Sequence, residues 1–240
     1  MVGTGPGSIE HLSPRALKAL QEADVIAGYK TYIELIAPIV EGKEIISTGM
    51  TREVERCRAA IQRARGGQKV ALVSSGDPGV YGMAGLALEI LHRENLFDQV
   101  EVEIIPGITS ATAAAALLGA PLMHDFVVMS LSDLLTPWEV IEKRLALAAQ
   151  GDFVVVLYNP ASHKRTSQIR RARELLLQHK KASTPVGIVR KAYRDGEEVV
   201  ITDLEHMLDH PLDMFSIVII GNNQTQRMGN FLVTPRGYAL

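Results

Sequence analysis

The stretch VALVSSGDPGVYG at residues 70–82 constrains the fold of this chain more than any other. Its first four residues are all apolar, which is typical of a strand buried on both faces of a parallel sheet. Three glycines and one proline follow within seven residues, so the strand ends in a shaped loop. Gly76 and Gly79 permit positive φ and close approach to a ligand, and Pro78 disfavours helical geometry at Asp77. Because ligands of open α/β sheets bind at the carboxyl ends of strands, this stretch indicates either a binding loop or an ordinary strand-to-helix turn.

The rest of the chain alternates short apolar strands with amphipathic helices, which favours an α/β fold with a mostly parallel sheet. Besides the strand at 70–73, we expect strands at 23–27, 44–47, 100–105, 126–129, 153–158, 185–190, 197–201 and 216–220. We expect a loop at 28–32, and helices from residue 14 and at 52–65, 83–93, 111–118, 137–149, 166–179 and 203–208. The sequence GAPL at 119–122 is the best boundary signal, and it predicts two domains, 1–120 and 121–240.

Composition excludes several classes of protein. The chain has 240 residues, 47% of them apolar, a net charge of −2 and a pI near 6.4, which give no general attraction to nucleic acid or to anionic membranes. The lone cysteine, Cys57, excludes an internal disulfide framework and a metal site built from several cysteines. We see no secretory segment and no apolar run near the ~18 residues of a membrane span. We therefore expect a soluble, cytoplasmic protein without a resident metal.

The glycine-rich start of the chain, GTGPGS at residues 3–8, invites a dinucleotide-binding interpretation. The spacing argues against it, because Ser8 stands where the fingerprint needs a glycine and Pro6 disturbs the turn. Two residues precede Gly3, fewer than the five or so of a normal strand. Either the first strand is very short or the true start lies upstream.

Four motifs, taken in order, resemble the tetrapyrrole methylases, which transfer a methyl group from S-adenosylmethionine. They are GTGPG, SSGDPGVYG, IIPGITS followed by LGAPL, and LYNP. Within that family, GYKTY, TGMTRE, SLSDLLTPWEVIEKR and TPRGY resemble a subgroup of cobalamin biosynthesis. That subgroup methylates precorrin-3B at carbon 17 and contracts the ring to precorrin-4, on a cobalt-free or a cobalt-containing substrate. The resemblance covers essentially the whole chain and implies two αβα domains with a cleft between them, a homodimer and a tetrapyrrole substrate.

The resemblance also implies which residues hold S-adenosylmethionine and release S-adenosylhomocysteine. A compact zwitterionic cofactor is held largely by backbone groups, which fits loops that permit close approach. Carried over position by position, the implied cofactor contacts are Ser75, Gly76, Asp77, Val80, Thr109, Ser110, Asn159, Ala192 and Ser216.

A tetrapyrrole with many carboxylates needs local positive charge on a chain of slightly acidic balance. The expected substrate contacts are the loop Gly5, Pro6, Gly7 and Ser8 and the cations Lys30, Arg52, Lys164 and Arg165, with His163 beside them. Each cation taken singly is more often a solvated surface charge. Several relatives carry a Tyr-Asp pair where this chain has Tyr29-Lys30, so no base is assigned at that position.

Ring contraction requires proton transfers, and His124 with Asp125 at the boundary between the halves are the candidates for acid and base. The alternative, a hydrogen-bonded structural pair, is equally supported. Other functions also stay open: methylation of another precorrin, methylation of a macromolecule such as ribosomal RNA or a translation factor, and tetrapyrrole binding without turnover.

Overall fold

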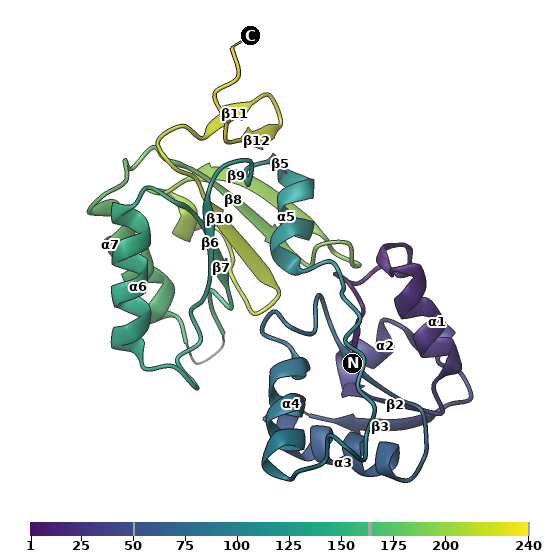
Figure 1. Cartoon of the computed structure of the whole chain (residues 1–240). Coiled ribbons are helices and arrows are strands. Elements are labelled where there is room, and N and C mark those ends of the chain that lie inside the picture. Colours follow the sequence, from purple (N-terminus) through teal and green to yellow (C-terminus); the bar gives the residue numbers. More distant parts are fainter. Residues whose placement is uncertain (50, 163–164, 240) are drawn as a thin grey trace. The chain divides into compact units, whose positions relative to one another are not determined.

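The computed structural model describes residues 1–49, 51–162 and 165–239, and it divides into two compact units, Met1–Ser110 and Ala111–Leu240 (Figure 1). The division falls before the expected boundary at residue 120. The reason is the small-residue helix α5 (Ser110–Leu118), whose Ala114 and Leu118 are fully buried against strands of the second unit. The helix is internal and tightly packed, as its alanine-rich sequence predicts.

The first unit is built on a four-stranded parallel sheet of order β1-β4-β2-β3. Its strands are β1 (Val2–Gly3), β2 (Val25–Tyr29), β3 (Glu44–Thr48) and β4 (Val70–Ser74). Its helices are α1 (Pro14–Glu22), α2 (Lys30–Glu34), α3 (Glu53–Arg65) and α4 (Met83–Arg93), with 3-10 turns at Ile9–His11 and Ala37–Ile39.

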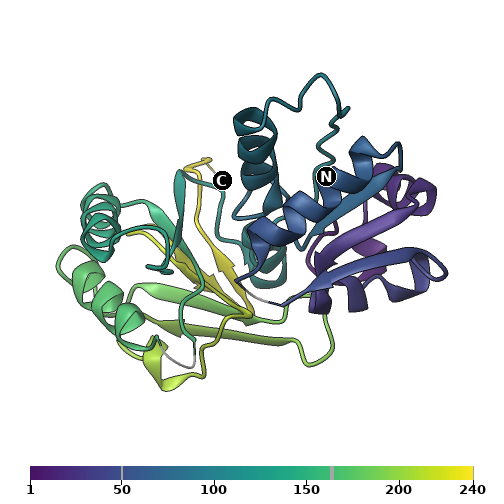
Figure 2. The same ribbon diagram turned by 90° about the horizontal axis from the view of Figure 1, so that it is seen from below.

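Alternate residues of the central strand β4 bury opposite faces of this sheet, as the two-residue repeat of a strand requires. Ala71 and Val73 pack with helix α1, whereas Leu72 packs with α3 and α4. Figure 2 shows the ribbons of these helices around the sheet. Helices therefore cover both faces, and the αβα layering expected for this half is confirmed. The buried Cys57 of α3 lies in the second of these cores, where burial raises the pKa of its thiol to about 11.

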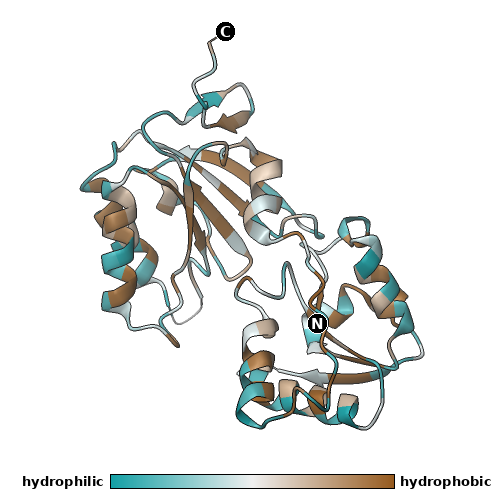
Figure 3. Cartoon of the chain, in the orientation of Figure 1, coloured by the Kyte–Doolittle hydropathy of each residue, from teal (hydrophilic) through white to brown (hydrophobic). Residues whose placement is uncertain are grey.

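The second unit contains a five-stranded sheet of order β6-β7-β10-β8-β9. Figure 3 shows that its inner strands are strongly apolar. Residues of α6 and α7 bury one face of the sheet and α5 buries the other, so this unit also has αβα layers. Its elements are β6 (Phe126–Ser130), α6 (Trp138–Gln150), β7 (Val154–Tyr158), α7 (Ser167–Leu177), β8 (Pro185–Arg190), β9 (Glu198–Asp203) and β10 (Ser216–Ile220). A three-stranded sheet joins β11 (Gln226–Met228), β12 (Phe231–Val233) and β5 (Gly119–Ala120), and a 3-10 turn spans Met207–Asp209.

The prediction of a mostly parallel sheet is wrong for the second unit. Within its described five-stranded sheet only β6 and β7 pair in parallel, while β10 pairs antiparallel with β7 and β8, and β8 pairs antiparallel with β9. A short connection joins β8 to β9, and a parallel pair needs a crossover of a dozen residues or more. The alternation of strand with helix breaks down after α7, where the helix expected at 203–208 is a single 3-10 turn.

Two local predictions in the first unit are also wrong. The loop expected at 28–32 does not exist, because β2 runs on to Tyr29 and Lys30 begins helix α2. The strand expected at 100–105 is reduced to one bridge between Ile105 and Val2. Since β1 contains two residues, the segment before Ile105 has little strand beside it to pair with.

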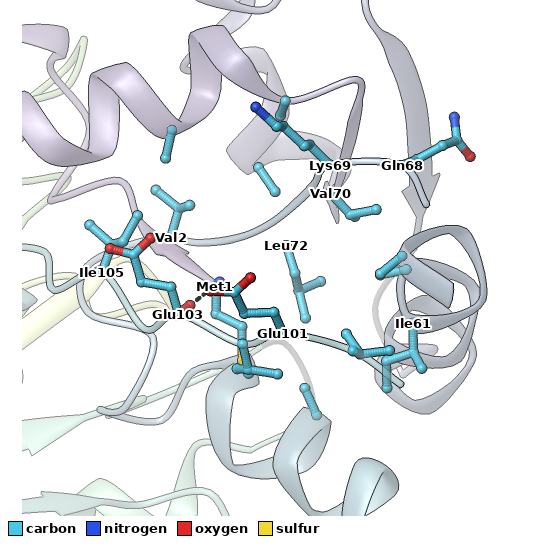
Figure 4. A pocket seen from close by; sticks show the side chains of 18 of the residues that line it. Met1, Val2, Ile61, Gln68, Lys69, Val70, Leu72, Glu101, Glu103 and Ile105 are labelled. Carbon is cyan, nitrogen blue, oxygen red and sulfur yellow. Dashed lines mark hydrogen bonds between the residues drawn. The ribbon is translucent and has the colours of Figure 1, made fainter. Parts of the chain in front are cut away.

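A cavity of about 500 Å³ lies between β4 and the 100–105 segment (Figure 4). Only Val73 and Ser74 of β4 pair with β1, so Val70 and Leu72 line the cavity on one side. On the other side, the terminal ammonium of Met1 donates to the Glu103 carbonyl at 2.6 Å. Burial lowers the pKa of that ammonium, although Glu103 opposes the shift.

No helix of the described chain combines the length and the apolar character of a membrane span.

We predict that a strand-forming extension placed before Met1 stabilises the first unit. Three added β-branched residues would continue the ladder that Met1 begins with Glu103 and would cover the open edge of β4. We expect the melting temperature to rise by about 2–4 °C, measured by scanning calorimetry. Three added glycines are the matched control and should change it little, and an equal response to both extensions would contradict the prediction.

Candidate active site

Three loops of the first unit are joined by backbone hydrogen bonds at the carboxyl edge of its sheet. The N–H of Thr4 donates to the carbonyl of Ser74 at 2.9 Å. Gly5 and Gly76 then exchange two hydrogen bonds, at 3.1 and 2.7 Å. Gly3 lies in the same ladder and donates to the Ile105 carbonyl at 3.0 Å. The chain start, the GDPG loop and the PGITS loop, far apart in sequence, therefore form one surface.

Glycine is required where these loops cross. A side chain built at Gly107 would come within 2.1 Å of the Gly76 carbonyl oxygen, and one at Gly3 would come within 2.6 Å of the Gly107 nitrogen. Gly76 also has φ of +69°, a left-handed conformation that other residues adopt only with strain. The glycines noted in the sequence thus permit backbone-to-backbone packing among the three loops.

The carboxylate of Asp77 ties two of the loops together. Its Oδ1 accepts the Gly79 N–H at 2.8 Å, which shapes its own turn. Its Oδ2 accepts the Gly107 N–H at 3.1 Å, which belongs to the next loop along the chain. A turn alone accounts for the first bond but not for the second. Of the two interpretations of this stretch, the structure therefore shows more than an ordinary turn.

The GDPG loop leads directly into helix α4. The Ser74 hydroxyl accepts the N–H of Met83 at 3.1 Å, and the Pro78 carbonyl accepts the N–H of Ala84 at 2.9 Å. These bonds fix the start of the helix against the end of β4. Val80 stays 36% exposed between them, while Ser75, Asp77, Thr109 and Ser110 are half-buried. The predicted cofactor residues of the first unit therefore lie on two adjacent, mutually anchored loops.

The predicted substrate residues of the first unit are more scattered. Gly5 and Pro6 are buried, and Gly7 and Ser8 are half-buried. The Ser8 hydroxyl accepts the Glu10 N–H at 3.2 Å and so caps a 3-10 turn. Lys30 and Arg52 are exposed and pair with nearby carboxylates, Lys30 with Glu34 of α2 at 3.9 Å and Arg52, the residue before α3, with Glu55 at 3.1 Å.

In the second unit, Asn159 and Arg165 are brought together at the end of β7. Asn159 has φ of +50°, and its amide donates to the Ser130 hydroxyl at 3.0 Å. Arg165 Nη1 donates to the carbonyls of Asn159 and Leu131, at 2.7 and 3.1 Å. Burial lowers the pKa of Arg165, opposed by Asp133. Part of this guanidinium therefore holds the loop after β7, and Lys164 and His163 fall outside the described residues.

The other two predicted cofactor residues of this unit have different surroundings. Ala192 is half-buried in the turn after β8. Ser216 is 1% exposed, and its hydroxyl donates to Asp213 Oδ1 at 3.0 Å. Partial burial works against the ionised form of Asp213, but hydrogen bonds led by that from Arg190 lower the pKa of the carboxyl. The Ser216 side chain is thus part of a structural cluster at the start of β10.

His124 and Asp125 are exposed neighbours before β6. The Nδ1 atom of His124 accepts the backbone N–H of Asp125 at 2.9 Å and lies 4.0 Å from its carboxylate. This local pairing matches the structural alternative and does not test the catalytic one. Within the described residues there is no group of three or more His, Cys, Asp and Glu side chains able to hold a metal ion.

Sequence analysis missed two polar contacts. The Tyr158 hydroxyl, in the LYNP motif, accepts the N–H of Ala111 at 2.8 Å and so caps helix α5. Arg56 of α3 is only 3% exposed, and its guanidinium reaches the end of β3. Arg56 is four residues from the buried Ala60, so the helical period places it on the inner side of α3. The charge of arginine, which usually indicates exposure, led this position to be overlooked.

Comparison with known proteins identifies the family that this chain resembles. A model described as Tetrapyrrole (Corrin/Porphyrin) Methylases matches residues 1–208. A probable cobalt-factor III C(17)-methyltransferase of Salmonella typhimurium is 52% identical, covering 100% of this chain and 99% of that protein. A cobalt-factor III methyltransferase of Priestia megaterium is also 52% identical, but this chain spans only 44% of it. A precorrin-3B C(17)-methyltransferase of a Sinorhizobium species is 40% identical and matches over 100% and 96% of the two chains.

Solved structures give the same fold. The crystal structure of the methyltransferase CobJ has a TM-score of 0.91 and 38% identity, over 98% of both chains. The X-ray structure of CbiF, a cobalt precorrin-4 methyltransferase, has a TM-score of 0.77 and 27% identity, over 92% of both chains.

We predict that Asp77→Ala loosens the PGITS loop without unfolding the first unit. Removing the carboxylate leaves the N–H groups of Gly79 and Gly107 without their acceptor. Amide hydrogen exchange at Gly107, followed by NMR, should accelerate by about tenfold or more, since a charged acceptor contributes about 1.5–3 kcal/mol. The N–H of Thr4, bonded to Ser74 at the same edge, is the internal control and should keep its protection. An unchanged exchange rate at Gly107 would show that the carboxylate does not hold that loop.

Proposed function

This chain belongs to the tetrapyrrole (corrin/porphyrin) methylases, and from that premise we propose that it methylates carbon 17 of a precorrin-3B-type ring. The methyl donor is S-adenosylmethionine, the ring is cobalt-free or contains cobalt, and the reaction contracts the ring to the corresponding precorrin-4. The observation that carries this proposal is the match to the Salmonella relative, which is 52% identical over nearly the full length of both chains. This relative and the Sinorhizobium relative are both named as methyltransferases of carbon 17.

The anchored loops of the first unit fit the cofactor. S-adenosylmethionine, when bound, supplies a methyl group activated by a sulfonium charge. The backbones that cross at Gly76 and Gly107 leave no room for side chains between the loops. A ligand at this carboxyl edge of the sheet would therefore contact mainly peptide groups. We propose contacts from Ser75, Gly76, Asp77, Val80, Thr109 and Ser110 in this unit and from Asn159, Ala192 and the backbone at Ser216 in the other.

For these residues the task is alignment more than proton transfer. A rigid loop holds a donor in one position, and methyl transfer is then accelerated chiefly by an in-line approach of the acceptor carbon. The two bonds of the Asp77 carboxylate supply that rigidity, because they fix the GDPG and PGITS loops to each other. The proton transfers of ring contraction we assign to His124 and Asp125.

The tetrapyrrole carboxylates call for cations. We propose the loop of Gly5, Pro6, Gly7 and Ser8 with Lys30, Arg52, Lys164 and Arg165 as substrate contacts. Among the described residues, Lys30 pairs with Glu34 and Arg52 pairs with Glu55, and both ion pairs are largely exposed, so these cations are available to exchange partners. Arg165 is the most constrained of the set, because its Nη1 already bonds two carbonyls.

We also propose that the protein works as a cytoplasmic homodimer that binds neither nucleic acid nor membrane. The net charge of −2 supports the absence of nucleic-acid binding. Leu134 and Leu135, which are 76% and 95% exposed, support self-association, since adjacent exposed leucines favour a covered surface. The second candidate substrate is a different precorrin, favoured by the 27% identity to CbiF, a cobalt precorrin-4 methyltransferase.

We predict that the purified protein binds S-adenosylhomocysteine in a saturable manner by calorimetry, and that Asp77→Ala weakens this binding about tenfold. The expected change reflects the loss of the two bonds by which the carboxylate fixes the loops, while the backbone of Asp77 keeps its proposed contact with the cofactor. Incubation with cobalt-factor III or precorrin-3B and labelled donor should add one methyl group and contract the ring, read by mass spectrometry and NMR. A methylated but uncontracted product would remove the contraction from the proposal, and absence of cofactor binding would refute it entirely.

We predict that Lys30→Ala raises the apparent KM for the tetrapyrrole about threefold and leaves the affinity for S-adenosylhomocysteine unchanged. The effect is modest because the ammonium is exposed and its interactions are screened by water. Lys18→Ala is a matched control, since Lys18 forms a similar exposed pair with Glu22 on helix α1. If Lys30→Ala instead weakened cofactor binding alone, Lys30 would belong to the cofactor site.

A further inference from the structure

Arg56 is a buried cation whose charge no acidic side chain balances. It lies in the second turn of α3 and is 3% exposed. Among the described residues, no carboxylate comes within ion-pair distance of its guanidinium, whereas Arg63 on the same helix pairs with Glu44 at 2.5 Å. A buried charge without a counter-charge is unfavourable, so this arrangement indicates a partner that the folded chain does not itself supply.

The contacts of the guanidinium divide it into an occupied end and an open edge. Nη1 donates to the Thr48 hydroxyl at 2.5 Å and faces the Gly49 carbonyl at 3.5 Å. Nη2 faces the thioether of Met83 at 3.6 Å, and thioether sulfur is a weak acceptor. Nε is buried and has no hydrogen-bond partner among the residues that the structure describes. The Nε–Nη2 edge, one of those that carboxylates grip with two parallel bonds, is therefore the unsatisfied one.

The position of this edge matters as much as its chemistry. Thr48 is the last residue of β3, so the guanidinium lies at the carboxyl ends of the parallel strands. The GDPG loop follows β4 at the same end of the sheet. Met83 is the first residue of α4, and its N–H is capped by Ser74 of that loop. Its half-buried side chain packs at the margin of the second core of this unit, and an unbranched thioether side chain can adopt another conformer when a ligand arrives.

We propose that Arg56 recognises a carboxylate of the tetrapyrrole through its Nε–Nη2 edge. This inference rests on the proposed function and deepens it, because it names the group that the first unit uses to orient the substrate. Thr48 and Gly49 hold Nη1 in advance, so little side-chain freedom remains to be lost when the ligand arrives. The incoming carboxylate displaces the Met83 thioether and satisfies both open donors.

The test measures two affinities on each variant of the full chain. A stable porphyrin with eight carboxylates is titrated by absorbance in the presence of S-adenosylhomocysteine, and the latter is titrated alone by calorimetry. Arg56→Met, similar in size but uncharged, should bind the porphyrin about 10- to 100-fold more weakly and bind S-adenosylhomocysteine within threefold of the parent. Arg58→Met is the matched control, because Arg58 lies on the same helix but pairs with Glu94 at the surface, and both its affinities should stay unchanged.

Arg56→Lys serves if the methionine variant does not fold. Lysine keeps the charge but lacks the planar fork, so porphyrin binding should still weaken at least fivefold while S-adenosylhomocysteine binding stays the same. Two results would overturn the proposed role: folded variants that bind the porphyrin as tightly as the parent, or an equal fall in the affinities for the porphyrin and for S-adenosylhomocysteine. Either result would mean that Arg56 has a purely structural role. A parent protein that does not bind the porphyrin at all would instead refute the proposed function.

Discussion

The crossing of three backbones at Gly3, Gly76 and Gly107 is the constraint on which the candidate site depends. No β-carbon fits at Gly3 or Gly107, Gly76 has a left-handed backbone, and the Asp77 carboxylate fixes the arrangement through two N–H groups. Such contacts are specific because each depends on a carbonyl or an amide at a fixed position. The shape of this edge of the sheet is therefore set by main-chain geometry, and in the function that we propose the side chains around it supply charge and selectivity.

Much of the fold could be predicted from the sequence, because hydrophobic period and turn chemistry act locally. The apolar run before Ser74, the Ser13-Pro14 helix start and the exact span of β10 all follow from such signals. The direction of strands does not, since it depends on the length of connections and on which neighbour is already paired. This is why the antiparallel β8–β10 region and the unpaired segment before Ile105 were wrongly predicted.

The site shows the same division. Family motifs identified the loops, and the loops of the first unit do come together, but no sequence signal indicates that both oxygens of the Asp77 carboxylate accept backbone N–H groups. Nor does it distinguish a cation that faces solvent, such as Arg52, from one turned inward, such as Arg56. In the second unit, Ser216 and Arg165 are held by Asp213 and by two carbonyls, contacts that only tertiary structure defines.

The glycine crossing also has a consequence for how the protein acquires its activity. The crossing joins the chain start to Gly76 and Gly76 to Gly107, which are about 70 and 30 positions apart in the sequence. It therefore has high contact order and cannot form from one local segment. Closing those long loops has an entropic cost that is recovered only when the whole parallel sheet has formed. The ligand edge should thus mature among the last features of the first unit during folding, and a ligand that recognises it selects chains in which that unit is already complete.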